Sequence, residues 1–152
     1  LRTGHRRENF GDGFQNMCKA MRQLAEKYPE CDLVYPVHLN PNVRKPVQEI
    51  LTGLSNVYLI EPLQYEPFVY LMSESYLVLT DSGGIQEEAP SLGKPVLVTR
   101  DTTERPETIN CGLGKLIDTQ ITENICFFDE EFIDVVENPY GTNVCERIIT
   151  KL

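Results

Sequence analysis

Short, almost continuous apolar runs alternate with longer amphipathic segments along this chain, and that alternation limits the folds open to it. The runs at 33–37, 57–60, 76–80 and 95–99 are rich in β-branched and aromatic residues, and 115–117 is a weaker run of the same kind. Runs of this type suit strands that are covered on both faces of a parallel sheet. We therefore predict a strand at each position.

The segments between these runs carry helical periodicity. Between 9 and 28, apolar residues recur at steps of three and four, and Pro29 follows, which predicts one amphipathic helix that ends before the proline. Shorter helices are predicted at 43–51, 66–73, 84–92 and 143–151. Strands that alternate with helices indicate an α/β domain with a Rossmann-like, doubly wound parallel sheet. Since only residues 1–4 are left for the first strand, we expect either that it is truncated or that an upstream segment is missing.

Size and charge exclude several classes of function. A chain of 152 residues suits one domain. Its net charge of −9, from 23 acidic and 14 basic residues, disfavours nucleic acid and acidic membrane surfaces as partners. No apolar run approaches the roughly 18–20 residues that span a bilayer, and the start lacks the apolar core of a signal peptide. We therefore expect a cytoplasmic protein.

The cysteines give no sign of a metal or redox site. Their number is odd, no two are separated by only two to four residues, and the chain has only two histidines. This spacing is not typical of a zinc knuckle or of a thioredoxin-type pair. We expect reduced thiols, as in a cytosolic protein, with no metal and no cofactor. The five are Cys18, Cys31, Cys111, Cys126 and Cys145.

The most informative motif covers 80–88, where a predicted strand ends and a helix opens through Ser82, Gly83 and Gly84. Ligands of open α/β sheets lie outside the carboxyl ends of the strands, and glycines let a phosphate approach the amides of the first helical turn. Glu88 follows Gly84 by four residues, on the same helical face. Its carboxylate is placed to accept two ribose hydroxyl protons. The alternative is a tight turn with Ser82 as an N-cap.

A second polar segment, 101–107, follows the next predicted strand. Pro106 suits the first position of a helix, so Arg105 precedes that helix at the same edge of the sheet. The planar guanidinium of arginine matches the geometry of a phosphate group. The alternative is a surface loop with local Arg–Glu pairing.

Basic residues also gather ahead of the first long helix. His5, Arg6 and Arg7 form a local anion site in a chain that is acidic as a whole, and His5 is placed to donate a hydrogen bond to a phosphate or to act as an acid. The alternative is an exposed, charged chain end. His38 follows another predicted strand, where the alternative is a hydrogen-bonded structural residue. Residues 138–141 form a turn before the last helix, and the alternative there is a simple helix start.

Taken together and in order, six segments resemble the C-terminal half of the non-hydrolysing bacterial UDP-N-acetylglucosamine (UDP-GlcNAc) 2-epimerases. The resemblance implies a GT-B architecture, in which two Rossmann-like domains enclose the active site in the cleft between them. This chain, 1–152, would be the UDP-binding C-terminal domain without the N-terminal one. The segments are 3–11, 35–41, 81–90, 93–98, 100–107 and 138–141.

The resemblance also implies roles for single residues. Phe68 would pack against the uracil, where the alternative is ordinary helix packing. The backbone of Ser82, Gly83 and Gly84 would hold the pyrophosphate, and Glu88 would bind the ribose hydroxyls. Arg105 and His5 would contact the phosphates. Bacterial members bind a second UDP-GlcNAc as an activator, and the residues that match this half's part of that site are Arg6, Arg7 and His38.

The reaction of the family inverts C2 of the sugar. A base removes the C2 proton while UDP leaves C1, and UDP then adds back to the unsaturated sugar. The resemblance places the acid and base carboxylates in the N-terminal domain. We therefore expect this chain alone to bind UDP or a UDP-sugar without epimerising it, and to pair with an N-terminal half or to self-associate. The other hypotheses are a non-catalytic nucleotide-binding or assembly subunit of a split enzyme, and the nucleotide-binding half of a GT-B glycosyltransferase.

Overall fold

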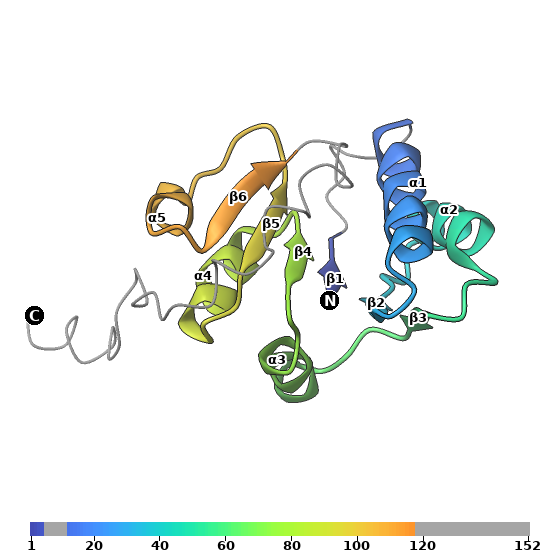
Figure 1. Cartoon of the computed structure of the whole chain (residues 1–152), viewed down its shortest axis with the longest axis horizontal. Coiled ribbons are helices and arrows are strands. Elements are labelled where there is room, and N and C mark those ends of the chain that lie inside the picture. The colour runs from blue at the N-terminus through green and yellow to red at the C-terminus, as the bar shows by residue number, and fades with distance from the viewer. Residues whose placement is uncertain (5–11, 118–152) are drawn as a thin grey trace, which may run out of the picture.

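The computed structural model describes residues 1–4 and 12–117 (Figure 1). The helix predicted at 143–151 and the turn at 138–141 lie outside the described residues. Strands and helices alternate through the described chain, as predicted. The strands are β1 (Arg2–Thr3), β2 (Leu33–Pro36), β3 (Val57–Ile60), β4 (Val78–Thr80), β5 (Val96–Thr99) and β6 (Gly114–Ile117), and the helices are α1 (Asp12–Lys27), α2 (Pro41–Leu51), α3 (Tyr65–Ser73), α4 (Gly83–Ser91) and α5 (Pro106–Asn110).

Every recorded strand pair is parallel. Four strands form a sheet in the order β1-β4-β5-β6, and β2 pairs with β3. β2 also lies beside β1, where the hydroxyl of Tyr35 donates to the carbonyl of Gly4 at 3.1 Å. The spatial order is therefore β3-β2-β1-β4-β5-β6, which is the doubly wound order of Rossmann-like domains. The predicted fold class is confirmed, and the predicted short first strand is the two-residue β1.

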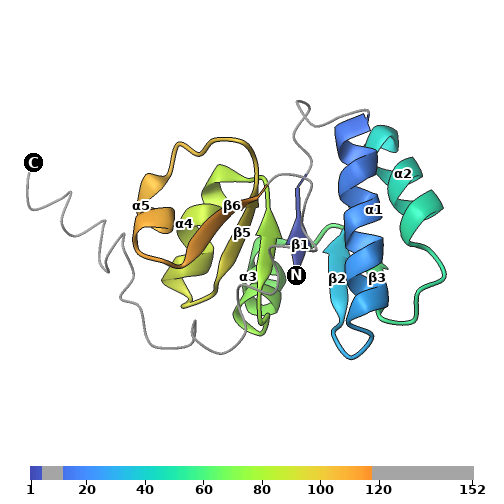
Figure 2. The ribbon, with the colours of Figure 1, turned by 45° about the horizontal axis from the view of Figure 1, so that its top comes forward.

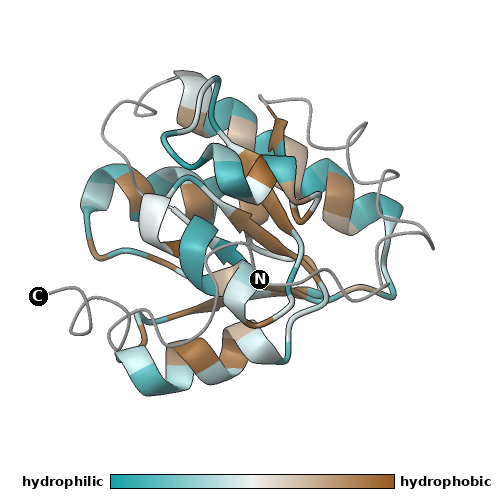
Figure 3. Cartoon of the chain, turned by 90° about the vertical axis from the view of Figure 1, so that its left-hand side faces the viewer, coloured by the Kyte–Doolittle hydropathy of each residue, from teal (hydrophilic) through white to brown (hydrophobic). Residues whose placement is uncertain are grey.

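Helices cover both faces of the strands. Figure 2 shows α1 and α2 side by side beyond β2 and β3, with α4 and α5 at the other side of the molecule. One buried cluster joins α1 and α2 to Tyr35, Leu79 and Leu97, and a second joins α3 and α4 to Val78 and Val96. Adjacent residues of β4 and β5 thus point to opposite cores. Figure 3 shows the strands as mostly apolar, which explains their continuous apolar sequence.

The starts of α2 and β4 differ from the prediction by two residues each. Helix α2 begins at Pro41 rather than Val43, because Asn40 acts as the N-cap: its side chain accepts a hydrogen bond from the Asn42 amide at 3.0 Å. Strand β4 begins at Val78 rather than Tyr76, and the Tyr76 side chain is exposed. The apolar run around Tyr76 therefore includes a loop residue. Among the described residues, no helix is long and apolar enough to cross a membrane.

A buried amide fixes the end of the longest helix. The side-chain nitrogen of Asn56 donates to the carbonyl oxygens of Ala25, Tyr28 and Cys31 at 3.0, 3.2 and 3.0 Å. The last carbonyls of a helix have no partners within the helix, so a side-chain donor at this place satisfies them. Asn56 thereby ties the end of α1 to the start of β3.

We expect Asn56→Ala to lower the free energy of unfolding by about 1–3 kcal/mol, because it strips buried carbonyls of their donor. Urea unfolding followed by circular dichroism measures the loss. Asn42→Ala, at an exposed position on α2, is the matched control and should change stability by less than about 0.5 kcal/mol. Equal effects of the two substitutions would contradict this role of Asn56.

Candidate functional site

The chain order reverses between β1 and β4, the two central strands. β1 leads to α1 on one face of the sheet, whereas β4 leads to α4 on the other. Such a switch point leaves a crevice at the carboxyl ends of the strands, where doubly wound proteins bind ligands. The predicted glycine turn, residues 82–84, follows β4 directly and therefore lies at this crevice.

Two threonines on the central strands shape the glycine turn. The hydroxyl groups of Thr3 and Thr80 are 3.0 Å apart, and the Ser82 amide donates to Thr80 Oγ1 at 3.0 Å. The amide of Ser82 is thus engaged within the protein. Its side chain makes no capping hydrogen bond, in contrast to the alternative in which Ser82 is a simple N-cap. The hydrogen-bond donors that the turn has available for a ligand are therefore the Ser82 hydroxyl and the backbone amides that follow it.

The two glycines leave the start of α4 accessible. A Cβ built on Gly83 would meet nothing within 4 Å, and one on Gly84 would meet only Glu88 Oε1, at 3.8 Å. Among the described residues, no recorded hydrogen bond uses the amides of Gly83 and Gly84. Such first-turn amides, together with the helix dipole, attract anions. The described residues therefore leave these two amides available to a ligand.

Glu88 turns back toward the start of its own helix, since its Oε1 lies 3.8 Å from the place that a Cβ on Gly84 would take. Burial raises the pKa of its carboxyl group, and the neighbouring charge of Glu87 raises it further. The predicted spacing of four residues therefore brings this carboxylate to the glycine turn. A carboxylate at this place has lone pairs for hydroxyl donors of a ligand.

Gln86 links the glycine turn to the segments that follow β5. It is fully buried, and its side chain donates to the Ser82 carbonyl at 3.2 Å and accepts from the Thr103 hydroxyl at 2.5 Å. The backbone carbonyl of Gln86 accepts a hydrogen bond from the Thr108 hydroxyl at 2.7 Å. Sequence reasoning missed Gln86. The available signal was a glutamine in the apolar register of a helix, four residues after Ser82.

Arg105 lies beside α4 and pairs with one acidic side chain of that helix, Glu87. Its Nε donates to Glu87 Oε1, and its Nη1 donates to the Glu104 carbonyl at 3.1 Å. Its amide donates to Thr103 Oγ1 at 2.9 Å, so the network of Gln86 also places Arg105. Arg105 thus pairs with a glutamate of α4, 18 residues away in the sequence, rather than locally within its own loop, as the alternative has it. The pair is 37% and 43% exposed, and exposed pairs of this kind are weak, about 0–1 kcal/mol.

Phe68 and His38 lie on elements other than α4. Phe68 is half-buried in α3, where it packs against the cluster under α3 and α4. His38 is exposed after β2, two strands away from β4, and its Nδ1 accepts from the Asn40 amide at 3.2 Å. The structure thus gathers Ser82, Gly83, Gly84, Glu88 and Arg105 around α4. His5, Arg6 and Arg7 lie outside the described residues.

A buried cation, Arg2, lies on the face of the sheet opposite to the glycine turn. Arg2 is 1% exposed, and its Nη1 donates to the carbonyls of Thr3 and Leu79. A Cβ on Gly4 would lie 2.6 Å from both terminal nitrogens of Arg2 and 2.7 Å from Asp81 Oδ1. Only glycine leaves room there for the approach of the two charged groups. Asp81 directly precedes the glycine turn, so Gly4 and Arg2 lie close to the start of that turn.

Comparison with known proteins decides the family. The model of the UDP-N-acetylglucosamine 2-epimerase family matches residues 1–152. The chain belongs to this family. The UDP-N-acetylglucosamine 2-epimerase of Campylobacter jejuni is 54% identical over 162 residues, covering 100% of this chain and 42% of the relative. The chain thus spans less than half the length of such a relative.

Solved structures of family members agree with the fold. The UDP-GlcNAc 2-epimerase of Neisseria meningitidis bound to UDP-GlcNAc superposes with a TM-score of 0.89 at 53% identity, covering 99% of this chain and 43% of that one. The S. aureus MnaA–UDP co-structure gives a TM-score of 0.89 at 44% identity, over 98% of this chain and 42% of that one. Among the described residues of this family member, no group of three or more His, Cys, Asp or Glu side chains is arranged to hold a metal ion.

The network of Gln86 generates a testable expectation. Gln86→Leu should lower stability by about 1–3 kcal/mol, because it leaves the Thr103 hydroxyl without its acceptor in a part-buried place. The amide of Arg105, which is bonded to that hydroxyl, should exchange its proton faster in a hydrogen-exchange experiment read by mass spectrometry. Gln23→Leu, on the exposed side of α1, is the control. Unchanged exchange at Arg105 would show that Gln86 does not order this loop.

Proposed function

We propose that this chain is the UDP-binding part of a UDP-GlcNAc 2-epimerase. The observation that carries the proposal is the open glycine turn at the switch point, with the Glu88 carboxylate folded over it. Membership of the family supports the same assignment, and structures of relatives bound to UDP-GlcNAc and to UDP support the class of ligand. The family match favours an epimerase over a glycosyltransferase half.

The diphosphate is the group that the turn suits best. In the proposed complex, the amides of Gly83 and Gly84 and the hydroxyl of Ser82 donate to phosphate oxygens at the positive end of α4. The engaged amide of Ser82 stays with Thr80, where it holds the turn in shape. Glu88 accepts the two ribose hydroxyl protons, and Phe68 packs against the uracil.

Basic side chains complete the phosphate contacts. Arg105 exchanges part of its weak, exposed pairing with Glu87 for a phosphate oxygen, which charge-assisted bonding favours. His5 donates to the phosphates or acts as an acid. Arg6, Arg7 and His38 form this half's share of a second, activating UDP-GlcNAc site.

In the proposed reaction, this part of the enzyme stabilises the leaving group. A base takes the C2 proton, the C1–O bond breaks with its electron pair going to UDP, and an unsaturated acetamido sugar results. UDP then adds back to C1 while C2 is reprotonated on the opposite face. Donors fixed around the departing diphosphate lower the barrier to both steps. The base and acid come from the N-terminal domain, for which residues 1–152 form the complementary C-terminal domain.

This division of labour defines the partners of the chain. We propose that it docks on an N-terminal half or on a second copy of itself, and that an assembly role is the alternative if it binds nucleotide without contributing to turnover. A cytoplasmic location accords with the free thiols of Cys18, Cys31 and Cys111.

UDP should bind the full chain in a calorimetric titration, and Glu88→Ala should weaken binding about tenfold or more through the loss of charge-assisted hydrogen bonds. Arg105→Ala should weaken it by a similar or smaller factor. Glu49→Ala, an exposed site on α2, should leave the affinity unchanged. Unaltered binding in both Glu88→Ala and Arg105→Ala would remove this site assignment.

The chain alone should form no UDP-ManNAc from UDP-GlcNAc, and any turnover would refute its inactivity.

The raised pKa of Glu88 sets the pH dependence of binding. The ionised carboxylate accepts both ribose hydroxyls, so affinity for UDP-GlcNAc should be full near pH 7. It should fall as acid protonates Glu88, at a pH above the range of an ordinary glutamate, since burial and Glu87 raise this pKa. UDP-GlcNAc is the suitable ligand because its diphosphate diester does not titrate there. Glu88→Gln should bind more weakly and lose this acid dependence; a retained dependence would assign it to another group.

A further inference from the structure

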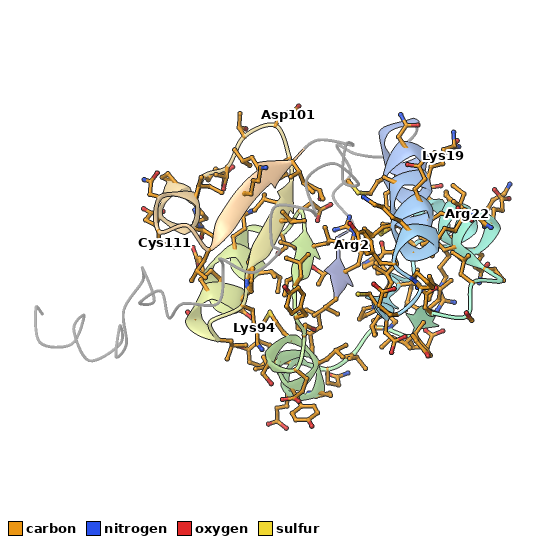
Figure 4. The ribbon with its side chains drawn as sticks, viewed as in Figure 1. Arg2, Lys19, Arg22, Lys94, Asp101 and Cys111 are labelled. Carbon is orange, nitrogen blue, oxygen red and sulfur yellow. The ribbon has the colours of Figure 1, made fainter. Side chains whose placement is uncertain are left out.

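Arg100 is a mostly buried cation at the carboxyl end of β5. It follows Thr99, the last residue of that strand, and its side chain is 13% exposed. It begins the loop, residues 100–105, that ends at Arg105. Figure 4 labels Asp101 in this loop, at the edge of the sheet where the β6 arrow ends.

The guanidinium group of Arg100 has a donor nitrogen that is not used. Among the residues that the structure describes, its Nη1 is buried and has no hydrogen-bond partner. Its Nη2 lies 3.8 Å from Glu104 Oε1, too far for a hydrogen bond, and the Glu104 side chain is 70% exposed. A guanidinium group does not lose its proton in proteins, so it cannot relieve burial by becoming neutral. A buried charged donor without an acceptor is costly and calls for an explanation.

The strand register places this cation next to the proposed diphosphate site. Val98 of β5 pairs with Thr80 of β4. Arg100 and Ser82 follow these two residues by two positions each, so the chain leaves the sheet at the same edge in both cases. The loop is then fastened to α4 from its other end, because Thr103 bonds Gln86 and Arg105 bonds Glu87.

We propose that Arg100 is a second arginine of the diphosphate site and that its Nη1 donates to a phosphate oxygen of the bound nucleotide. This inference rests on the proposed function and deepens it. The two ends of the loop then have different tasks. Arg105 is half-exposed and paired with Glu87 on the rim, whereas Arg100 supplies an unused donor from a drier position, where a charge-assisted bond is stronger.

A purely structural role is the competing account, in which Arg100 holds the loop through Glu104. The two accounts predict opposite behaviour of the ligand-free protein. If Arg100 is an unpaired buried charge awaiting an anion, Arg100→Gln should leave the melting temperature unchanged or raise it. If Arg100 fastens the loop, the same substitution should lower the melting temperature, and Glu104→Gln should do so as well.

The test compares Arg100→Gln, Arg100→Lys and Glu104→Gln in the full chain, by calorimetric titration with UDP, uridine and inorganic pyrophosphate. We expect Arg100→Gln to lower the affinity for UDP and for pyrophosphate about ten- to a hundredfold. The affinity for uridine should not change, because uridine carries no phosphate group. Arg100→Lys should restore part of the affinity, since it keeps the charge without the planar fork. Glu104→Gln should bind UDP as the unmodified chain does.

The outcomes separate this inference from the proposed function. If UDP binds in a Glu88-dependent way but equally well to all Arg100 variants, the inference is overturned and the proposed function stands. If UDP does not bind but pyrophosphate binds in an Arg100-dependent way, the anion role of Arg100 stands and the nucleotide assignment fails. If Arg100→Gln and Glu104→Gln both lower stability and UDP affinity, Arg100 has a structural role in the loop, and the inference is wrong.

Discussion

A two-residue parallel ladder between β1 and β4 is the constraint on which the site depends. Arg2 and Thr3 pair with Leu79 and Thr80, and this contact places two strands with oppositely directed connections side by side. The Thr3 and Thr80 hydroxyls meet there, and Thr80 then holds the amide of Ser82. Strands that lead to helices on opposite faces leave a crevice at their carboxyl ends. The ladder thus both opens the crevice and shapes the turn that faces it.

Helix α4 and the loop after β5 act as one unit because a single buried side chain joins them. The side chain of Gln86 donates a hydrogen bond to the Ser82 carbonyl at the start of its own helix, and it accepts one from the Thr103 hydroxyl. In the proposed function this unit has a clear role, because a departing diphosphate needs donors that are already in place, and side chains on a tied loop reorganise less than those on a free one. The net charge of the chain is unfavourable to such an anion. The proposed site would therefore hold it with local donors and basic side chains.

Local patterns in the sequence were enough for the order of elements, the fold class and the spacing of Gly84 and Glu88, because these follow from periodicity along the chain. The start of α2 was missed because the apolar periodicity begins at Val43, whereas the cap at Asn40 and the first helical residue, Pro41, come before it. Gln86, Asn56 and Arg100 were missed for a different reason. Each is a polar residue whose burial is set by segments distant in sequence, and hydrophobic periodicity carries no information on such partners. The pairing of Arg105 with Glu87 depends likewise on how the loop folds onto α4.

The β1–β4 ladder also bears on how the domain is assembled in time. It joins positions 77 residues apart, whereas β4, β5 and β6 are neighbours both in sequence and in space. The entropy lost on closing a loop grows with its length, and distant pairings slow folding. We therefore expect the β1–β4 ladder, in the middle of the sheet, to close later than the pairings among β4, β5 and β6. Although β1 is synthesised first, the proposed nucleotide site is then complete only once this ladder has closed.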